Sequence, residues 1–209
     1  MNMNNINNIN NINKRVTLYA TLARTTPATF FNLIILNCII SPSYNSFYLL
    51  TSYCLVVLSN FIFKGLIIKP IYTFLNKTSL PLLGLGPRPP KAESCALILD
   101  GVMSKSFGMP SGHSQIAWTV ATYIVYKIIN NWYKNKKENK IITIFGYIWL
   151  ILSCIIILTC AIYISYSRVY IEGCHTIQQV SVGGGLGVIC GFLIGYFEND
   201  AVNLMSKIY

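Results

Sequence analysis

The sequence predicts an all-α, polytopic bundle of transmembrane helices. Of its 209 residues, 54% are hydrophobic and only 11% are charged, and the mean hydropathy is +0.53. This balance lies well outside that of soluble globular domains. The apolar residues also gather in long runs, and a helix needs about 20 such residues to cross a hydrocarbon core of roughly 30 Å. Both observations indicate a membrane protein.

The N-terminal segment differs in composition from the rest of the chain. It begins with the low-complexity tract MNMNNINNINNINKR, which lacks the charged, apolar and cleavage regions of a signal peptide. We expect a disordered Asn-rich tail over residues 1–25, one transmembrane domain over residues 26–200 and a short tail over residues 201–209.

The apolar runs are the candidates for membrane crossings. They lie at about residues 28–40, 47–63, 116–129, 141–164 and 180–197. The second, fourth and fifth runs are long enough to span. The third spans only if its polar start belongs to the helix, and the first is short enough to be re-entrant, interfacial or tilted. Four or five crossings are expected.

Four glycines recur every fourth residue in the last run, at Gly183, Gly187, Gly191 and Gly195. On a helix they form one stripe, which favours close packing of two transmembrane helices. Such a stripe would also suit an oligomer. The alternative of a phosphate-cradling loop lacks the strand and the Lys-Ser/Thr pair that this kind of loop requires.

Polar stretches at residues 76–113, 130–140 and 166–179 separate the later runs. Two crossings lie between the first and third stretches, so these two share one membrane face. The middle stretch is basic, and the positive-inside rule makes its face cytoplasmic. We therefore expect the other two stretches to face the lumen or the exterior. The sequon at Asn76 would report this orientation if it carried sugar.

Charge and cysteine content exclude several classes of protein. The net charge is +10, but Lys and Arg are scattered over short connections, which does not indicate nucleic-acid binding. The seven cysteines include no CxxC pair, so no zinc site is indicated and no metal or other cofactor is expected. Cys95 and Cys174 fall in the two polar stretches that share a face, and a bridge between them stays open.

The chain has two histidines, and each lies beside small polar residues near an arginine. His113 follows a Pro-Ser-Gly turn at the start of the third run. Free N–H groups at the start of a helix attract an anion, so Ser111 and Gly112 are candidate phosphate ligands. The alternative is simple helix capping by serine.

His175 follows Arg168 in the third polar stretch. The guanidinium of Arg168 presents a fork of donors that matches phosphate oxygens, although an arginine that snorkels from a helix end would look the same. Gln179 lies one helical turn after His175, where its amide oxygen can accept the imidazole N–H.

A proline-rich turn presents Arg88, with Lys77 upstream. Proline restricts the backbone on both sides of Arg88, so little entropy is lost on binding an anion. A plain proline-rich loop would carry the same pattern.

The order of these motifs resembles the type 2 phosphatidate phosphatase superfamily over about residues 76–187. The motifs are Arg88-Pro89, then Pro110-Ser111-Gly112-His113, then Ser167-Arg168 followed by His175. The segments 108–115 and 166–180 most resemble the dolichyl-diphosphatase branch, in which Gln replaces the Asp of most relatives. Two positions depart from the family pattern. The family lysine seven residues before the arginine is Pro81 here, and the gap from Arg168 to His175 is one residue longer.

The resemblance implies a bundle of the type 2 phosphatidate phosphatase kind that hydrolyses a lipid-linked phosphate or diphosphate without a metal. It implies that His175 is the nucleophile and His113 the general acid, with Gln179 orienting the nucleophile. Arg88, Arg168, Ser111, Gly112 and Lys77 would hold the phosphate. The two departures leave open a catalytically impaired protein that binds lipid phosphate, and the superfamily also contains vanadate-dependent peroxidases.

Overall fold

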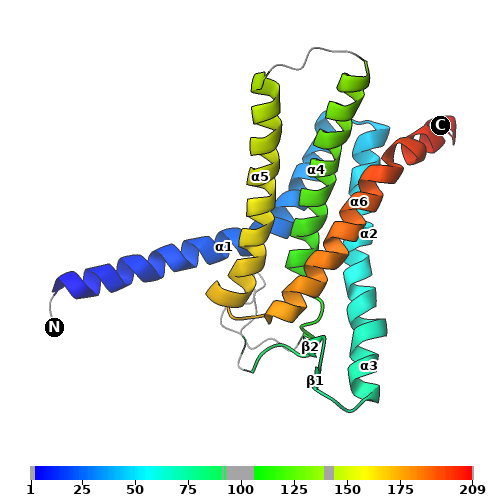
Figure 1. The fold of residues 1–209 in the computed structure, drawn as a ribbon. Coiled ribbons are helices and arrows are strands. Elements are labelled where there is room, and N and C mark those ends of the chain that lie inside the picture. The colour runs from blue at the N-terminus through cyan, green and yellow to red at the C-terminus, as the bar shows by residue number, and fades with distance from the viewer. Residues whose placement is uncertain (1–2, 91, 93–105, 139–143, 209) are drawn as a thin grey trace.

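The computed structural model describes residues 3–90, 92, 106–138 and 144–208 (Figure 1). Five long helices make up most of it, and three short helical segments and a small hairpin lie near one end. The long helices are α1 (Met3–Ile40), α2 (Tyr44–Ile62), α4 (Gly112–Lys137), α5 (Ile144–Tyr166) and α6 (Ile177–Ile208). The short segments are α3 (Lys69–Phe74), the π-helices η1 (Phe63–Ile68) and η2 (Ser167–Ile171), and strands β1 (Ser79–Leu80) and β2 (Gly84–Leu85).

Four helical stretches in the described chain are long and apolar enough to cross a membrane. They are Ala20–Ile40, Tyr44–Phe74, Ile144–Ile171 and Ile177–Lys207. The first stretch begins before the apolar run at residues 28–40, since it includes the helical residues of mixed polarity from Ala20 onward. The structure thus confirms the predicted all-α, multi-pass membrane bundle.

Helix α4 lies in the middle of the bundle and packs against both α5 and α6 (Figure 1). The glycine stripe of α6 faces it. At Gly183, Gly187 and Gly191 a Cβ atom would collide with the backbone carbonyl oxygens of α4, and at Gly195 it would collide with the ring of Tyr126. The stripe therefore serves packing within the chain. These contacts within the chain give no support to an oligomer through the same glycines.

Helix α1 contains most of residues 1–25, the segment that the sequence assigned to an Asn-rich tail. Helix α1 runs without interruption from Met3 through Pro27 to Ile40. Ala20 and Ala23 are buried, and Arg24 pairs with Glu172. The end of this segment thus contacts the loop between η2 and α6.

A short hairpin connects α3 to the loop that carries Arg88. β1 and β2 pair antiparallel, with Ser79 opposite Leu85. The N–H groups of Gly108 and Met109 both donate to the carbonyl oxygen of Gly86, each at 3.0 Å. These bonds fasten the hairpin to the segment that leads into α4, and so hold the first predicted motif beside the second.

Candidate active site

The predicted motifs converge at one end of the bundle. The start of α4, η2 at the end of α5, the start of α6 and the β1–β2 hairpin all lie there (Figure 1). α4 and α5 run side by side, so the chain leaves this end along α4 and returns to it along α5. The basic residues Lys134, Lys136 and Lys137 belong to the last turn of α4, at the opposite end. Lys140 lies outside the described residues.

His175 is buried and held by Gln179. The Nδ1 atom of His175 lies 2.9 Å from Oε1 of Gln179. The Nε2 group of Gln179 donates to the carbonyl oxygens of Leu85 and Pro87, at 2.7 and 2.6 Å. Because both carbonyls can only accept, the amide orientation is determined, and its oxygen must accept a proton from Nδ1. The Nε2 atom of His175 therefore carries the free lone pair.

The environment of His175 keeps its ring neutral. Burial lowers the pKa of His175 to about 3, and the positive charge of Arg88 acts in the same direction. The hydrogen bond with Gln179 opposes this shift, and Arg168 and Lys64 add to it. A neutral imidazole with its lone pair on Nε2 is the form that can act as a nucleophile.

His113 is the second residue of α4. Its Nε2 atom lies 3.3 Å from the carbonyl oxygen of Arg24, which orients the ring. His113 interacts electrostatically with His175, Arg88 and Arg168. The two histidines thus lie at the same end of the bundle, within one group of cations.

The turn before His113 presents an uncapped helix start. Ser111 occupies the N-cap position of α4 but makes no side-chain capping bond. Its hydroxyl is fully buried and has no hydrogen-bond partner in the described chain, while Ser114 donates to the carbonyl oxygen of Val180. Simple capping by either serine is therefore not observed. Among the described residues no side chain caps the first N–H groups of α4, and free N–H groups at a helix start are the arrangement that binds an anion.

Arg88 reaches the segment that carries the nucleophile candidate. Its Nη1 group donates to the carbonyl oxygen of Cys174 at 3.3 Å, and its Nε group donates to Ser106 at 3.0 Å. These bonds place its half-buried guanidinium next to His175.

Arg168 is fully buried and pairs with Glu172 on the same turn. Nη1 of Arg168 lies 3.1 Å from Oε2 of Glu172, and Nε of Arg24 lies 2.7 Å from the same oxygen. Nη2 of Arg168 donates to the carbonyl oxygen of Ala23, and Oε1 of Glu172 accepts from Ser167. One buried carboxylate thus orients two arginines. The bonds to buried groups exclude an exposed, snorkelling role for Arg168.

A π-turn lies between the end of α5 and His175. In η2 the N–H group of Glu172 donates to the carbonyl oxygen of Ser167, five residues back instead of four. The N–H groups of Cys174 and His175 still bond the Arg168 carbonyl oxygen.

Three site residues escape the sequence motifs. Arg24 and Glu172 form the ion pairs described above, and Lys64 in η1 interacts electrostatically with Arg88 and His175. The spacing of Glu172, four residues after Arg168, is a signal that sequence analysis could have used. Lys77, by contrast, is exposed, and its backbone N–H donates to the carbonyl oxygen of Tyr72. The structure does not bring Lys77 to the cluster.

Cys174 is disulfide-bonded, and the partner considered from the sequence, Cys95, lies outside the described residues. The cysteines at positions 38, 54, 154, 160 and 190 are free thiols. Among residues 3–90, 92, 106–138 and 144–208, no group of three or more His, Cys, Asp or Glu side chains could hold a metal ion.

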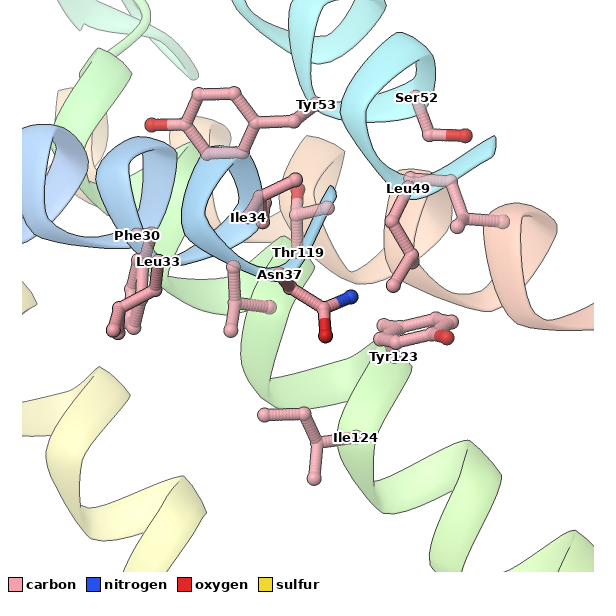
Figure 2. A pocket seen from close by; sticks show the side chains of 12 residues that line it. Phe30, Leu33, Ile34, Asn37, Leu49, Ser52, Tyr53, Thr119, Tyr123 and Ile124 are labelled. Carbon is pink, nitrogen blue, oxygen red and sulfur yellow. The ribbon is translucent and has the colours of Figure 1, made fainter. Parts of the chain in front are cut away.

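An apolar cavity of about 260 Å³ lies deeper in the bundle, between α1, α2, α4 and α6 (Figure 2). Its lining includes Phe30, Leu49, Tyr123 and Ile194, with Asn37 among the few polar groups. None of the predicted site residues lines it. The candidate site is therefore the cationic cluster at the end of the helices and not this cavity.

A model of the PAP2 superfamily matches residues 45–202, and the chain belongs to this superfamily. Its members are generally phosphatases, which suggests an enzyme that acts on lipid phosphates. No curated protein and no solved structure matches the chain.

Proposed function

We propose that this protein hydrolyses a lipid-linked phosphate or diphosphate through a phosphohistidine on His175. The observation that carries the proposal is the buried, neutral ring of His175, whose Nδ1–H is bound by Gln179 and whose Nε2 is free beside Arg88. A ring prepared in this way attacks phosphorus without first losing a proton.

In the proposed reaction, Nε2 of His175 forms a bond to phosphorus while the bond from phosphorus to the lipid-side oxygen breaks. His113 in its protonated form gives a proton to that leaving oxygen and becomes neutral. A water oxygen then attacks the phosphohistidine, the P–N bond breaks, and His113 takes the proton from the water. The products are inorganic phosphate and the lipid alcohol, or the lipid monophosphate when the substrate is a diphosphate.

The charges of the site support phosphoryl transfer. Arg88, Arg168 and the uncapped N–H groups around Ser111 and Gly112 supply donors for the equatorial oxygens, where negative charge builds up. Fixed cations of this kind stabilise the transition state without reorganising. No metal is part of this proposal.

The choice of a lipid substrate rests on the fold. The cluster lies at the ends of helices that are apolar enough to span a membrane, which is where the headgroup of a membrane lipid lies. A polyprenyl or dolichyl diphosphate is the preferred substrate, because the segments 108–115 and 166–180 resemble the dolichyl-diphosphatase branch, including the glutamine at position 179.

We further propose that the site faces the lumen or the exterior. The basic last turn of α4 lies at the opposite end of the bundle, and such residues favour the cytoplasmic side. The disulfide at Cys174 supports the same orientation, because disulfides persist in oxidising compartments.

The proposal is tested by phosphate release from a panel of lipid phosphates and diphosphates, using the full chain in detergent micelles. The His175→Gln variant is the blank, since it keeps a polar side chain of similar size but has no nucleophile. Turnover by the wild type but not by the variant is expected. Full activity of His175→Gln would overturn the mechanism, and no turnover of any lipid phosphate would favour a protein that only binds them. Vanadate should inhibit the enzyme, whereas activation of peroxide chemistry would favour a peroxidase.

A further inference from the structure

Lys64 lies on the buried face of the segment that joins α2 to α3. Along this segment Asn60 and Tyr72 are buried, and Lys64 and Ile68 are half-buried, while residues 65–67 are exposed. The spacing of four residues puts these side chains in one stripe that faces the rest of the protein. The ammonium group is thus on the protein side of a helix that is otherwise exposed around it.

The two ends of this stripe contact the two loops of the candidate site. Asn60 donates to Oε1 of Gln115 at 2.7 Å, and its own oxygen lies close enough to Gly112 that a Cβ there would meet it at 3.2 Å. The hydroxyl of Tyr72 donates to the carbonyl oxygen of Gly84 at 2.8 Å. Lys64 therefore lies between the turn that leads to His113 and the hairpin that leads to Arg88.

The charge of Lys64 acts on the candidate site, and no described carboxylate pairs with it. It interacts electrostatically with Arg88 and His175. Within the part of the chain that the structure describes, no carboxylate pairs with Lys64, whereas Arg168 has Glu172 and Lys127 has Glu198. Two cations held close together without a carboxylate between them repel each other, and a bound anion removes that repulsion.

The local backbone is unusual at this residue. The N–H group of Lys69 donates to the carbonyl oxygen of Lys64, five residues back, which defines the π-helix η1. π-turns occur frequently at functional sites, and the other π-turn of this protein carries Arg168.

We propose that Lys64 binds the substrate phosphate together with Arg88, in place of the lysine that the sequence lacks at Pro81. This inference rests on the proposed function and names a ligand of the same site. Pro81 is exposed at the tip of the hairpin and Lys77 is exposed after α3, so neither position supplies this charge. The cation reaches the phosphate from a different helical segment instead.

The test measures binding of orthovanadate, a phosphate analogue, by calorimetry on the full chain in detergent micelles. The variant is Lys64→Gln, and the matched control is Lys69→Gln, which removes an exposed lysine from the next turn of the same segment. Loss of one charge-assisted bond to the anion should weaken vanadate binding by about 10- to 100-fold in Lys64→Gln. Lys69→Gln should stay within about twofold of the wild type. Lys64→Arg should recover part of the affinity, which separates a role in binding from a loss of folding.

The proposal would be overturned if Lys64→Gln and Lys69→Gln bound vanadate with equal affinity. It would also be overturned if only Lys77→Gln lost vanadate affinity. A wild type that binds no vanadate would also overturn it. Because calorimetry needs no turnover, a wild type that binds vanadate through Lys64 but releases no phosphate from any lipid would refute the proposed hydrolysis alone.

Discussion

Replacement of Glu172 by glutamine should destabilise the protein strongly and also impair turnover. The carboxylate has a side-chain exposure of 1%, and one oxygen accepts from Arg24 at 2.7 Å and from Arg168 at 3.1 Å. Glutamine keeps the shape but removes the charge that offsets two cations. Removing one partner of a buried ion pair lowers the free energy of unfolding by about 3–5 kcal/mol.

For a chain of this length, each kcal/mol shifts the unfolding midpoint by about 2–4 °C. Glu172→Gln should therefore lower Tm by roughly 6–20 °C. In the remaining folded protein, kcat/KM should also fall under the proposed mechanism, since the guanidinium of Arg168 loses the carboxylate that orients it.

The assay is thermal unfolding in detergent micelles, followed by phosphate release below the lower midpoint. Arg24→Gln is the control, because it removes the more exposed cation and leaves the pair of Arg168 and Glu172 intact; it should cost about 1–2 kcal/mol. The reasoning would be refuted if the unfolding midpoint of Glu172→Gln lay within about 2 °C of the wild type, which is roughly the error of such a measurement. A larger loss from Arg24→Gln than from Glu172→Gln would do the same.

Three further outcomes are expected. Gln179→Leu removes the acceptor of the imidazole proton of His175. It should lower kcat, measured by phosphate release, by about 10- to 100-fold with a smaller change in KM, because a misplaced nucleophile reacts slowly. An unchanged kcat would contradict this. Gly191→Ala should destabilise the protein by about 1–3 kcal/mol, because the new methyl group meets the backbone of α4. Gly185→Ala faces open space and should be neutral. Equal thermal unfolding midpoints for the two variants would contradict the packing. The difference in free energy of unfolding between the wild type and His175→Gln should shrink as pH falls from about 6.5 toward 3. Burial lowers the pKa of His175 to about 3 in the folded protein, whereas the unfolded chain takes up a proton near 6.5. A difference that grows on acidification would contradict this reasoning.

Much of the site could be predicted because its motifs are local. His175 and Gln179 lie one helical turn apart, so their hydrogen bond follows from spacing. The sequence predicted His113 and His175 at one end because two long helical runs lie between them, and α4 and α5 do lead the chain away from this end and back to it. The glycine spacing correctly indicated close helix packing.

The residues that were missed act through contacts between distant segments. Lys64 lies 24 residues before Arg88, at the end of an apolar run, and no local pattern connects it to the phosphate motifs. Arg24 falls in a segment whose composition suggested disorder, yet it pairs with Glu172 across 148 residues. Lys77 lies near Arg88 in the sequence, but the turn after α3 leaves it exposed.

The sequence alone determined the helical membrane class, the pair of histidines and the order of the candidate site motifs, because hydropathy and helical spacing are properties of single segments. The tertiary structure decided which charges meet. It brought Lys64 to Arg88, placed Arg24 and Arg168 on one carboxylate and covered the glycine stripe with α4. These contacts depend on how helices pack and where π-turns widen the backbone, and both are set by the whole bundle at once.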